Sequence, residues 1–413
     1  MSDIMKRILF VDDEPKLLEG LQRMLRPERR QWDMMFAVGG QEALAVMEKT
    51  PIDVVVTDMR MPGMDGASLL QAVHERYPGV MRIVLSGHFS AEAGLRAVPV
   101  AHQFLTKPCD PDKLKAAIER SSQPHGDAPD EATRRVISAI GALPSPPRTC
   151  RLLNEALDDV EASSEQIGRI IGQDVALTAK VLQLVNSAFF SLQREVTDTK
   201  TAVTFLGLDV LKQLVLSAEI LKTFHPVRPI MGFSLEDFDQ HSQRAAKIAN
   251  RLPAVGPVAD LAATAALLHD TGKLVLATRL PVQFEKALLK SIREKKALHI
   301  CEAEVFGTTH AAIGAYLLNL WGLPQPAVEA IAGHHKPQIG EKAGDPSGQP
   351  IADGLDLRAL VHIADGLAHE SALPPSPHGN PDLGGEGIDM DYVTAMGLAD
   401  RMDEWRAMSR EII

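Results

Sequence analysis

Residues 52–66 read Ile-Asp-Val-Val-Val-Thr-Asp-Met-Arg-Met-Pro-Gly-Met-Asp-Gly and place an acidic residue, Asp58, just after a short apolar run. The run 54–56 is typical of a strand that is buried on both faces of a parallel sheet. The proline and two glycines of 61–66 predict a sharp turn directly afterwards. Because ligand sites of open α/β sheets lie at the carboxyl ends of strands, Asp58 is a candidate site residue.

Three other apolar runs also end in polar side chains. The run in 6–13 ends in Asp12 and Asp13, a second ends in Ser86, and a third ends in Lys107, which a proline follows. Neighbouring parallel strands would bring these ends together, and carboxylates gathered in one crevice repel each other unless a cation lies among them. Hard oxygen ligands with room for water suit magnesium. The lysine would neutralise an anion held between the acids and the serine.

At this point the first 120 or so residues resemble the receiver domain of two-component response regulators. The resemblance implies that Asp58 accepts a phosphoryl group from a histidine kinase. It also implies that Asp12 and Asp13, with Asp58 and the backbone carbonyl of Arg60, hold Mg²⁺. Such a reaction is covalent catalysis by a carboxylate, in which the metal and a lysine stabilise the charge on the transferring group.

The same resemblance assigns the switching residues of the domain. It implies that Ser86 is the switch hydroxyl, that Lys107 contacts the phosphoryl group and that Phe104 turns inward on activation. Phosphorylation adds about 1.5–2 negative charges at one point, and the hydroxyl and the ammonium would reorient towards them. The family commonly has a cis peptide bond before the proline at position 108, a feature that sequence alone leaves open.

Composition limits the classes of function. The chain has 413 residues, enough for two or three domains, and a net charge of −11 that argues against a broad basic face for nucleic acid. Cys109, Cys150 and Cys301 are isolated, so neither a disulfide framework nor a cysteine-type zinc site is indicated. No apolar run approaches the ~18 residues of a membrane span, and no signal segment precedes the first strand. We therefore expect a cytoplasmic protein that neither enters a membrane nor binds DNA directly.

The periodicity of the chain changes after the first domain. We predict a flavodoxin-like, doubly wound α/β domain at 1–121, a polar linker at 122–130 and an all-helical domain with a C-terminal extension at 131–413. The expected strands are 7–11, 33–38, 53–57, 81–85 and 102–105, and the expected helices of the first domain are 15–25, 40–48, 66–77, 90–97 and 111–121. Helices of the second domain are expected at 174–188, 209–222, 234–251, 258–269, 281–296, 310–320, 324–334 and 356–370. Gly/Pro-rich loops are expected at 337–350 and 373–387, with a last helical piece after 389.

The helical part is similar to the HDOD domain, a relative of the HD phosphohydrolases. The motifs that carry this resemblance are, in chain order, Leu143-Pro144-Ser145-Pro146-Pro147, Asp174-Val175-Ala176-Leu177, Asn186-Ser187-Ala188, Phe205-Leu206-Gly207, Leu268-His269-Asp270-Thr271-Gly272-Lys273, Thr309-His310-Ala311-Ala312-Ile313-Gly314, Trp321-Gly322-Leu323-Pro324 and Gly333-His334-His335. The resemblance implies a signalling output module, which we expect to act by protein–protein contact.

A set of imidazoles and carboxylates in this part would suit one or two transition-metal ions. Its order is similar to the ligand order of the HD-GYP phosphodiesterases, which hydrolyse cyclic di-GMP, and the matching residues are His269, Asp270, His310, His334, His335 and Asp365, with His241 as a further member. This similarity implies iron or manganese as the cofactor.

Two departures from that enzyme pattern keep a second interpretation open. Lys336 stands where the enzymes place an acid after the paired histidines, and the Gly-Tyr-Pro segment that names them is missing. In the alternative, the histidines pair with one another and with backbone, and Asp270 and Asp365 act as caps. His225, His299, His362 and His369 are expected at the surface or as satisfied core residues, Lys273 as a cap or ion-pair partner and Trp321 in the core.

The sequence thus predicts a response regulator whose helical domain acts on a protein partner. The alternative is a metal-dependent phosphodiesterase for a cyclic dinucleotide, gated by the receiver. Whether the chain has enzymatic activity, which kinase and downstream protein it meets, whether it forms a homodimer and in which direction phosphorylation acts all stay open at this stage.

Overall fold

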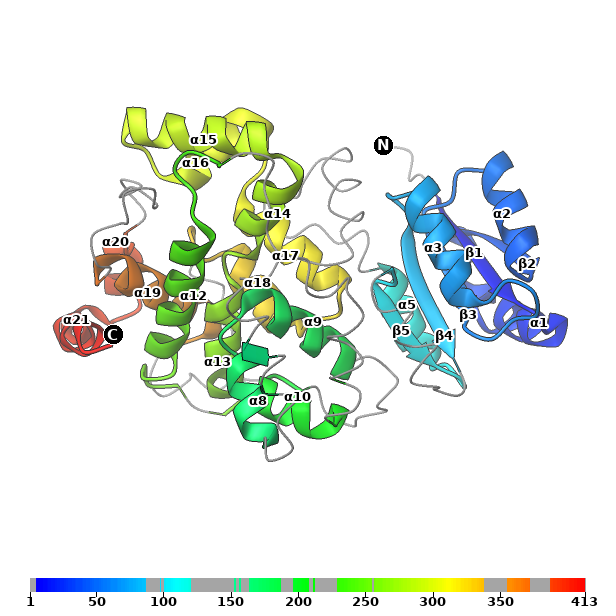
Figure 1. Cartoon of the computed structure of the whole chain (residues 1–413), viewed down its shortest axis with the longest axis horizontal. Helices are drawn as coiled ribbons and strands as arrows, with labels where there is room; N and C mark the ends of the chain where they lie inside the picture. Colours follow the sequence, from blue (N-terminus) through cyan, green and yellow to red (C-terminus); the bar gives the residue numbers. More distant parts are fainter. Residues whose placement is uncertain are drawn as a thin grey trace.

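The computed structural model describes residues 5–86, 97, 100–119, 152–153, 156, 163–186, 196–207, 211, 229–254, 256–337, 355–371 and 387–412 (Figure 1). The predicted linker at 122–130, the motif at 143–147 and nearly all of the two Gly/Pro-rich loops lie outside these residues. So do the helices expected at 90–97 and 209–222, apart from single positions.

The N-terminal domain is a parallel sheet of five strands with the order β2-β1-β3-β4-β5, so the predicted fold class is confirmed. The strands are β1 Lys6–Asp12, β2 Trp32–Val38, β3 Val54–Asp58, β4 Met81–Ser86 and β5 Gln103–Thr106. The helices are α1 Pro15–Met24, the short η1 Arg26–Arg30, α2 Gly40–Lys49, α3 Gly66–Arg76 and α5 Pro111–Glu119. In the register, Asp58 pairs with Leu85 and Ser86 with Thr106. The polar strand ends therefore meet at one edge of the sheet.

The turn after β3 brings the chain back against the backbone of Asp58. A Cβ atom on Gly66 would lie 2.1 Å from the carbonyl oxygen of Asp58, so only glycine fits at this position. Asp65 then caps α3 by accepting a hydrogen bond from the backbone N–H of Ser68 at 2.8 Å. The strand tip is thus fixed by a close backbone approach on one side and by a capped helix on the other.

The rest of the described chain is helical, as predicted. The helices are α8 Ser164–Ile171, α9 Val175–Val185, α10 Thr199–Leu206, α12 Leu235–Ala249, α13 Pro257–Leu268, α14 Thr271–Arg279, α15 Pro281–Glu294, α16 Leu298–Phe306, α17 His310–Leu320, α18 Gln325–Ala332, α19 Leu357–Glu370, α20 Met390–Ala395, the short η3 Ala399–Arg401 and α21 Met402–Arg410. The sequence analysis missed the short helices α8, α10, α14 and α16. No helix in the described part of the chain is both long enough and apolar enough to cross a bilayer.

The close crossing of α14 and α17 depends on two glycines that face each other. A Cβ atom on Gly272 would lie 1.9 Å from the carbonyl oxygen of His310, and one on Gly314 would lie 2.8 Å from the amide nitrogen of Gly272. The backbones of the two helices are therefore in direct contact. This contact fixes the start of α14 against the start of α17.

The two domains touch through the sheet edge at β5. In Figure 1, β5 and α5 face α9 and α17 of the helical part. The side-chain amide of Gln183 on α9 donates to the carbonyl oxygen of His102 at 2.9 Å, and that of Gln103 donates to the carbonyl oxygen of Leu320 at 3.1 Å. All three side chains, Gln183, Gln103 and His102, are buried. The contact is thus an enclosed interface in which glutamine amides satisfy backbone carbonyls.

We predict that Gly272→Ala forces α14 and α17 apart. Overpacking a tight contact costs about 1–3 kcal/mol, so the free energy of unfolding of the helical domain should fall by that amount. Chemical denaturation followed by circular dichroism measures it. Gly387→Ala is the control in the same domain, since a Cβ atom there meets nothing within 4 Å. Equal stability of the two variants would contradict the proposed tight crossing.

Candidate functional site

The ends of β1, β3 and β5 converge on one lysine. The Lys107 ammonium lies 2.5 Å from Asp12 Oδ2 and 2.5 Å from Asp58 Oδ1. Burial by itself would lower the pKa of Lys107, but its hydrogen bonds to Asp12 and Asp58 outweigh burial and raise the pKa above its ordinary value. The lysine is therefore cationic, and it holds two carboxylates that would otherwise repel each other.

Backbone amides aim the two carboxylates. Asp58 Oδ2 accepts from the backbone N–H of Arg60 at 2.6 Å, and Asp12 Oδ1 accepts from the backbone N–H of Glu14 at 2.9 Å. Asp13 lies beside Asp12 and is half-buried. This set of hard oxygen donors fits a magnesium ion.

The remaining features predicted for the receiver site are Ser86, Phe104 and the peptide bond before Pro108. Ser86 ends β4 in register with Thr106, and its side chain is outside the described part of the structure. Phe104 is buried, with 4% of its surface exposed. The peptide bond between Lys107 and Pro108 is cis. The predicted residues thus lie at one edge of the sheet, while their roles in phosphoryl transfer stay predictions.

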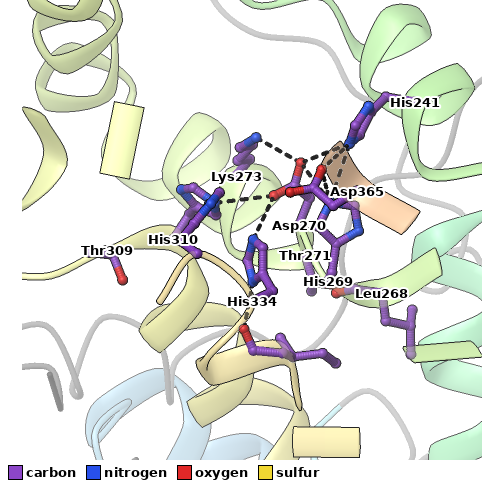
Figure 2. A network of polar contacts seen from close by, with 12 residues as sticks. His241, Leu268, His269, Asp270, Thr271, Lys273, Thr309, His310, His334 and Asp365 are labelled. Carbon is purple, nitrogen blue, oxygen red and sulfur yellow. Dashed lines mark hydrogen bonds and ion pairs between the residues drawn. The ribbon is translucent and has the colours of Figure 1, made fainter. Parts of the chain in front are cut away.

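A second polar site lies inside the helical part, where side chains from three helices, from one helix junction and from the segment after α18 meet (Figure 2). His269 and Asp270 join α13 to α14, His310 begins α17, and Asp365 lies within α19. His334 and His335 follow α18, and His241 lies on α12. The structure therefore brings all of the predicted ligand residues together.

Asp270 is at the centre of this cluster. Its Oδ1 lies 3.2 Å from His310 Nε2 and 3.9 Å from His334 Nε2, and its Oδ2 lies 3.4 Å from His269 Nε2. The ammonium of Lys273 contacts the same Oδ2 at 2.7 Å. Figure 2 shows these groups directed at one another from separate helices.

Hydrogen bonds at Nδ1 orient the imidazoles of His269 and His334. His269 Nδ1 lies 2.6 Å from the carbonyl oxygen of Ala266, and His334 Nδ1 lies 2.7 Å from that of Ile331. A carbonyl oxygen only accepts, so each Nδ1 donates to it, and each Nε2 faces the cluster. This arrangement, in which the far ring nitrogen donates to oxygen, is typical of metal-ligating histidines.

Glu302 on α16 orients the imidazole of His310 in the same way, and the sequence analysis did not predict this role. Its Oε2 accepts from His310 Nδ1 at 2.7 Å and from the backbone N–H of His310 at 2.8 Å. The side chain is fully buried. A glutamate in a short helix is usually a solvated residue, so no pattern in the sequence distinguished it from its exposed neighbour Glu304.

The pKa values of the cluster are strongly shifted. Burial would raise the pKa of Asp270, but His269 and Lys273 outweigh it and hold that pKa well below its usual range. Burial, and then the nearby His269, lowers the pKa of His334 well below its ordinary value. Burial would also lower the pKa of His269 and His310, but Asp270 and Asp365 raise that of His269 to about 10, and Glu302 raises that of His310 to about 9. A metal ion bound by these two imidazoles would therefore displace their Nε2 protons.

Among the described residues, two buried atoms at the centre of the cluster make no hydrogen bond, although the second lies 3.2 Å from His310 Nε2. They are His334 Nε2 and Asp270 Oδ1, and both point into the cluster. Unsatisfied buried polar atoms are costly, and a metal ion between them would satisfy both. The donor set of imidazole nitrogens and carboxylates fits a transition metal such as iron, manganese or zinc.

Comparison with known proteins matches both parts of the chain. The model of the response regulator receiver domain family matches residues 8–119, and that of the HDOD domain family matches residues 143–337. The chain is a response regulator with a receiver domain and an HDOD domain.

Individual relatives match only part of the chain. The chain is 34% identical over 128 residues to the hydrogenase transcriptional regulatory protein HoxA of Cupriavidus necator, a match that covers 30% of this chain and 26% of HoxA. It is 34% identical over 157 residues to the transcriptional regulatory protein GlrR of Escherichia coli strain K12, covering 38% of this chain and 34% of GlrR. The match therefore spans only about a quarter to a third of the length of these relatives.

Solved structures include a response regulator similar to both domains. The MmoQ response regulator from Methylococcus capsulatus str. Bath is 25% identical, with a TM-score of 0.44, and the match covers 62% of this chain and 98% of that chain. The signal receiver domain of an HD domain-containing protein from Pseudomonas fluorescens Pf-5 is 30% identical, with a TM-score of 0.27, and the match covers 28% of this chain and 93% of that chain.

The HDOD domain corrects the alternative interpretation of its acidic residues. Asp270 makes no side-chain hydrogen bond as a cap, and Asp365 lies inside α19, so the expectation that both are caps is wrong. Lys336 is exposed, so its ammonium does not enter the cluster. Lys273 pairs with Asp270, as one interpretation expected. The ammonium near the cluster is therefore that of Lys273 and not that of Lys336.

The other histidines of the HDOD domain fall into two groups. His362 is a satisfied core residue, because its Nδ1 lies 2.7 Å from the carbonyl oxygen of His334 and its Nε2 accepts from the backbone N–H of Asp389. His299 stacks on His335. His369 instead lies 3.4 Å from Asp365, at the edge of the cluster. Trp321 is buried as predicted, and His225 lies outside the described residues.

Proposed function

We propose that the receiver domain is switched by transfer of a phosphoryl group from a histidine kinase to Asp58. The observation that carries this proposal is the contact of one lysine, Lys107, with both Asp12 and Asp58 at the ends of parallel strands. An anion added to Asp58 would find that ammonium already in place. Electrostatic stabilisation of a transferring phosphoryl group needs such a preorganised cation.

The reaction exchanges one bond to phosphorus for another. A carboxylate oxygen of Asp58 forms a bond to phosphorus while the bond between phosphorus and the imidazole nitrogen of the kinase breaks. Asp12, Asp13, Asp58 and the carbonyl of Arg60 would hold magnesium, which supplies neutralising charge to the phosphoryl oxygens. Lys107 leaves its contact with Asp58 Oδ1 to pair with the new phosphoryl group.

The switch reaches the HDOD domain through β5. Lys107 directly follows this strand, whose first residue, Gln103, donates to the carbonyl oxygen of Leu320 on α17. The side-chain amide of Gln183 on α9 donates a hydrogen bond to the carbonyl oxygen of His102, the residue directly before β5. A movement of Lys107 would therefore act on two helices of the output domain within a few residues. We propose that the HDOD domain passes this change on by contact with a downstream protein.

We predict that Asp58→Ala prevents phosphorylation of the full-length protein by a small phosphodonor, because the resemblance to receiver domains makes Asp58 the phosphoacceptor, whereas Asp12, which Lys107 and a backbone amide also hold, would ligate magnesium. Intact-mass spectrometry with magnesium present measures the product. The exposed Asp33 offers a matched control, and Asp33→Ala should be modified as well as the wild type. A phosphoryl group on the Asp58→Ala protein, or equal labelling of wild type in chelator, would refute the assignment.

We predict that the double variant Gln103→Leu and Gln183→Leu uncouples the two domains. In the wild type, a phosphoryl-mimicking ligand on the receiver should change amide hydrogen exchange in α9 and α17, because the glutamines connect β5 to both helices. In the double variant, that change should disappear although the ligand still binds. Gln325→Leu, at an exposed position of α18, is the control. An unaltered exchange response in the double variant would exclude this route.

The preorganised cluster favours a second candidate function for the output domain, metal-dependent hydrolysis of a phosphodiester such as a cyclic dinucleotide. His269, Asp270, His310, His334, His335 and Asp365 would hold iron or manganese, which supplies a Lewis acid and an activated water. Lys273 lies beside Asp270, where its ammonium could meet a phosphate oxygen. The Gly-Tyr-Pro segment of the similar enzymes is missing from the sequence, which favours the binding module.

We predict that Glu302→Gln lowers the affinity of the HDOD domain for manganese about 10–100-fold, since Glu302 orients His310. Equilibrium dialysis of the full-length protein measures the affinity, and Glu304→Gln on the same helix is the control.

A second experiment tests for catalysis by supplying cyclic di-GMP to the manganese-loaded protein. Turnover that falls with Glu302→Gln and vanishes with His310→Ala supports the enzyme, and bound manganese without turnover supports the binding module.

A further inference from the structure

Helix α15 has apolar side chains on its outer face as well as on the face that packs into the fold. The residues of α15 that are buried are Phe284, Ala287, Leu288 and Ser291. On the outer face, Val282 is 65% exposed, Leu289 is 41% exposed and Ile292 is 38% exposed. A surface helix normally has one apolar stripe towards the core and polar residues elsewhere. The folding of this domain therefore does not account for the second set.

The exposed apolar side chains of α15 form one stripe. Since a helix turns once in about 3.6 residues, Val282, Leu289 and Ile292 lie within about 80° of one another around the helix axis. Met231 lies at the start of the stripe, because its backbone N–H donates to Glu285 Oε1 on the first turns of α15 at 3.0 Å. Its side chain is also exposed. We call Met231, Val282, Leu289 and Ile292 the α15 stripe, and it runs for about 15 Å along the helix.

Basic side chains border the α15 stripe. Residues 281–296 include five basic residues and two acidic ones, whereas the whole chain has a net charge of −11. Lys286 and Arg293 are exposed and lie within about 60° of Leu289 around the helix axis. Arg293 contacts its neighbour Glu294 at 3.0 Å, and Lys286 makes no ion pair with a described residue. The stripe is thus an apolar surface with a positively charged border.

The place of α15 in the fold leaves this surface accessible. Figure 1 shows α15 along the outer edge of the helical part, with α16 beside it and well apart from the receiver strands. The receiver domain therefore does not cover the α15 stripe. On its inner side, α16 carries Glu302, which contacts His310 at 2.7 Å, so the stripe is one helix away from the buried histidine cluster.

We propose that the α15 stripe is the docking surface of the HDOD domain for an acidic amphipathic helix of a partner protein. The inference rests on the proposed output by contact with a downstream protein, and it names the surface and the chemistry of that partner. Packing of helix against helix would bury the apolar side chains of the stripe. Carboxylates beside the apolar residues of the partner would meet Lys286 and Arg293.

The charges of the α15 stripe disfavour two other occupants. In a two-fold contact between two copies of the chain, the same surface meets itself, so the basic residues of both copies would come together and repel each other. Helices that lie on a membrane commonly insert Trp or Phe into the lipid, but the stripe has no aromatic side chain and includes the position of the acidic Glu285. An acidic protein helix satisfies both the apolar and the charged part of the surface.

The first test uses a fluorescent synthetic peptide that forms an amphipathic helix, with leucines on one face and glutamates beside them. Fluorescence anisotropy measures its binding to the full-length protein. Leu289→Ser should weaken binding at least about tenfold, because the contact loses a central apolar side chain. Phe205→Ser is the matched control and should bind as the wild type does, since Phe205 is 50% exposed on α10, at the opposite side of the helical part in Figure 1.

The second test changes the charge of the border. The double variant Lys286→Glu and Arg293→Glu should also weaken binding at least about tenfold, and added salt should weaken binding by the wild type. The double variant Lys247→Glu and Arg251→Glu is the control, because it makes the same change of charge at exposed positions near the end of α12. Circular dichroism confirms folding, and Val282→Ser replaces Leu289→Ser if that variant is unfolded.

The outcomes separate this proposal from the one on which it rests. The inference is wrong if the wild type does not bind the peptide, or if Leu289→Ser binds it equally well. It is also wrong if Leu289→Ser instead abolishes binding to vesicles of phosphatidylglycerol and phosphatidylcholine, or dissociates a dimer seen by sedimentation velocity. These results leave the phosphorylation of Asp58 and the coupling through β5 untouched. Turnover of cyclic di-GMP by the manganese-loaded protein would overturn the proposed output by contact, whatever the peptide does.

Discussion

The buried carboxylate of Asp270 is the constraint on which the HDOD domain depends. A charge that is removed from water is costly unless partners surround it, and Lys273, His269 and His310 supply those partners from three different places in the fold. The glycine contact between α14 and α17 allows His310 to approach this closely. The close helix crossing thus brings His310 within 3.2 Å of the carboxylate of Asp270.

The receiver also pairs a lysine with carboxylates, here at one edge of its sheet. Lys107 neutralises two acids that parallel strands bring together at the carboxyl edge of the sheet. In both domains, backbone groups fix the direction of the polar side chains. Amides of Arg60 and Glu14 aim the carboxylates, and the carbonyls of Ala266 and Ile331 aim the imidazoles. Backbone hydrogen bonds thus prepare both sites before any ligand arrives.

The sequence predicted those parts of the protein in which a local pattern has one physical solution. Apolar runs that end in Asp12, Asp58 and Lys107 can only meet at one sheet edge, and the sheet was predicted nearly residue by residue. The short helices α14 and α16 were missed because their buried faces are set by tertiary contacts and not by periodicity. Glu302 was missed for a related reason. Its contact with His310 depends on residues that the fold alone brings close, and nothing near it in the chain marks it.

The helix α17 has its two ends in different environments. Leu320, at its C-terminal end, accepts a hydrogen bond from the receiver, and His310, at its N-terminal end, lies in the histidine cluster. Helices of this length are stiff, so the two ends move as one body about 15 Å long. Thermodynamic linkage makes such a connection reciprocal. If the proposed phosphorylation of Asp58 changes the free energy of ligand binding at the cluster, ligand binding at the cluster changes the free energy of phosphorylation by the same amount.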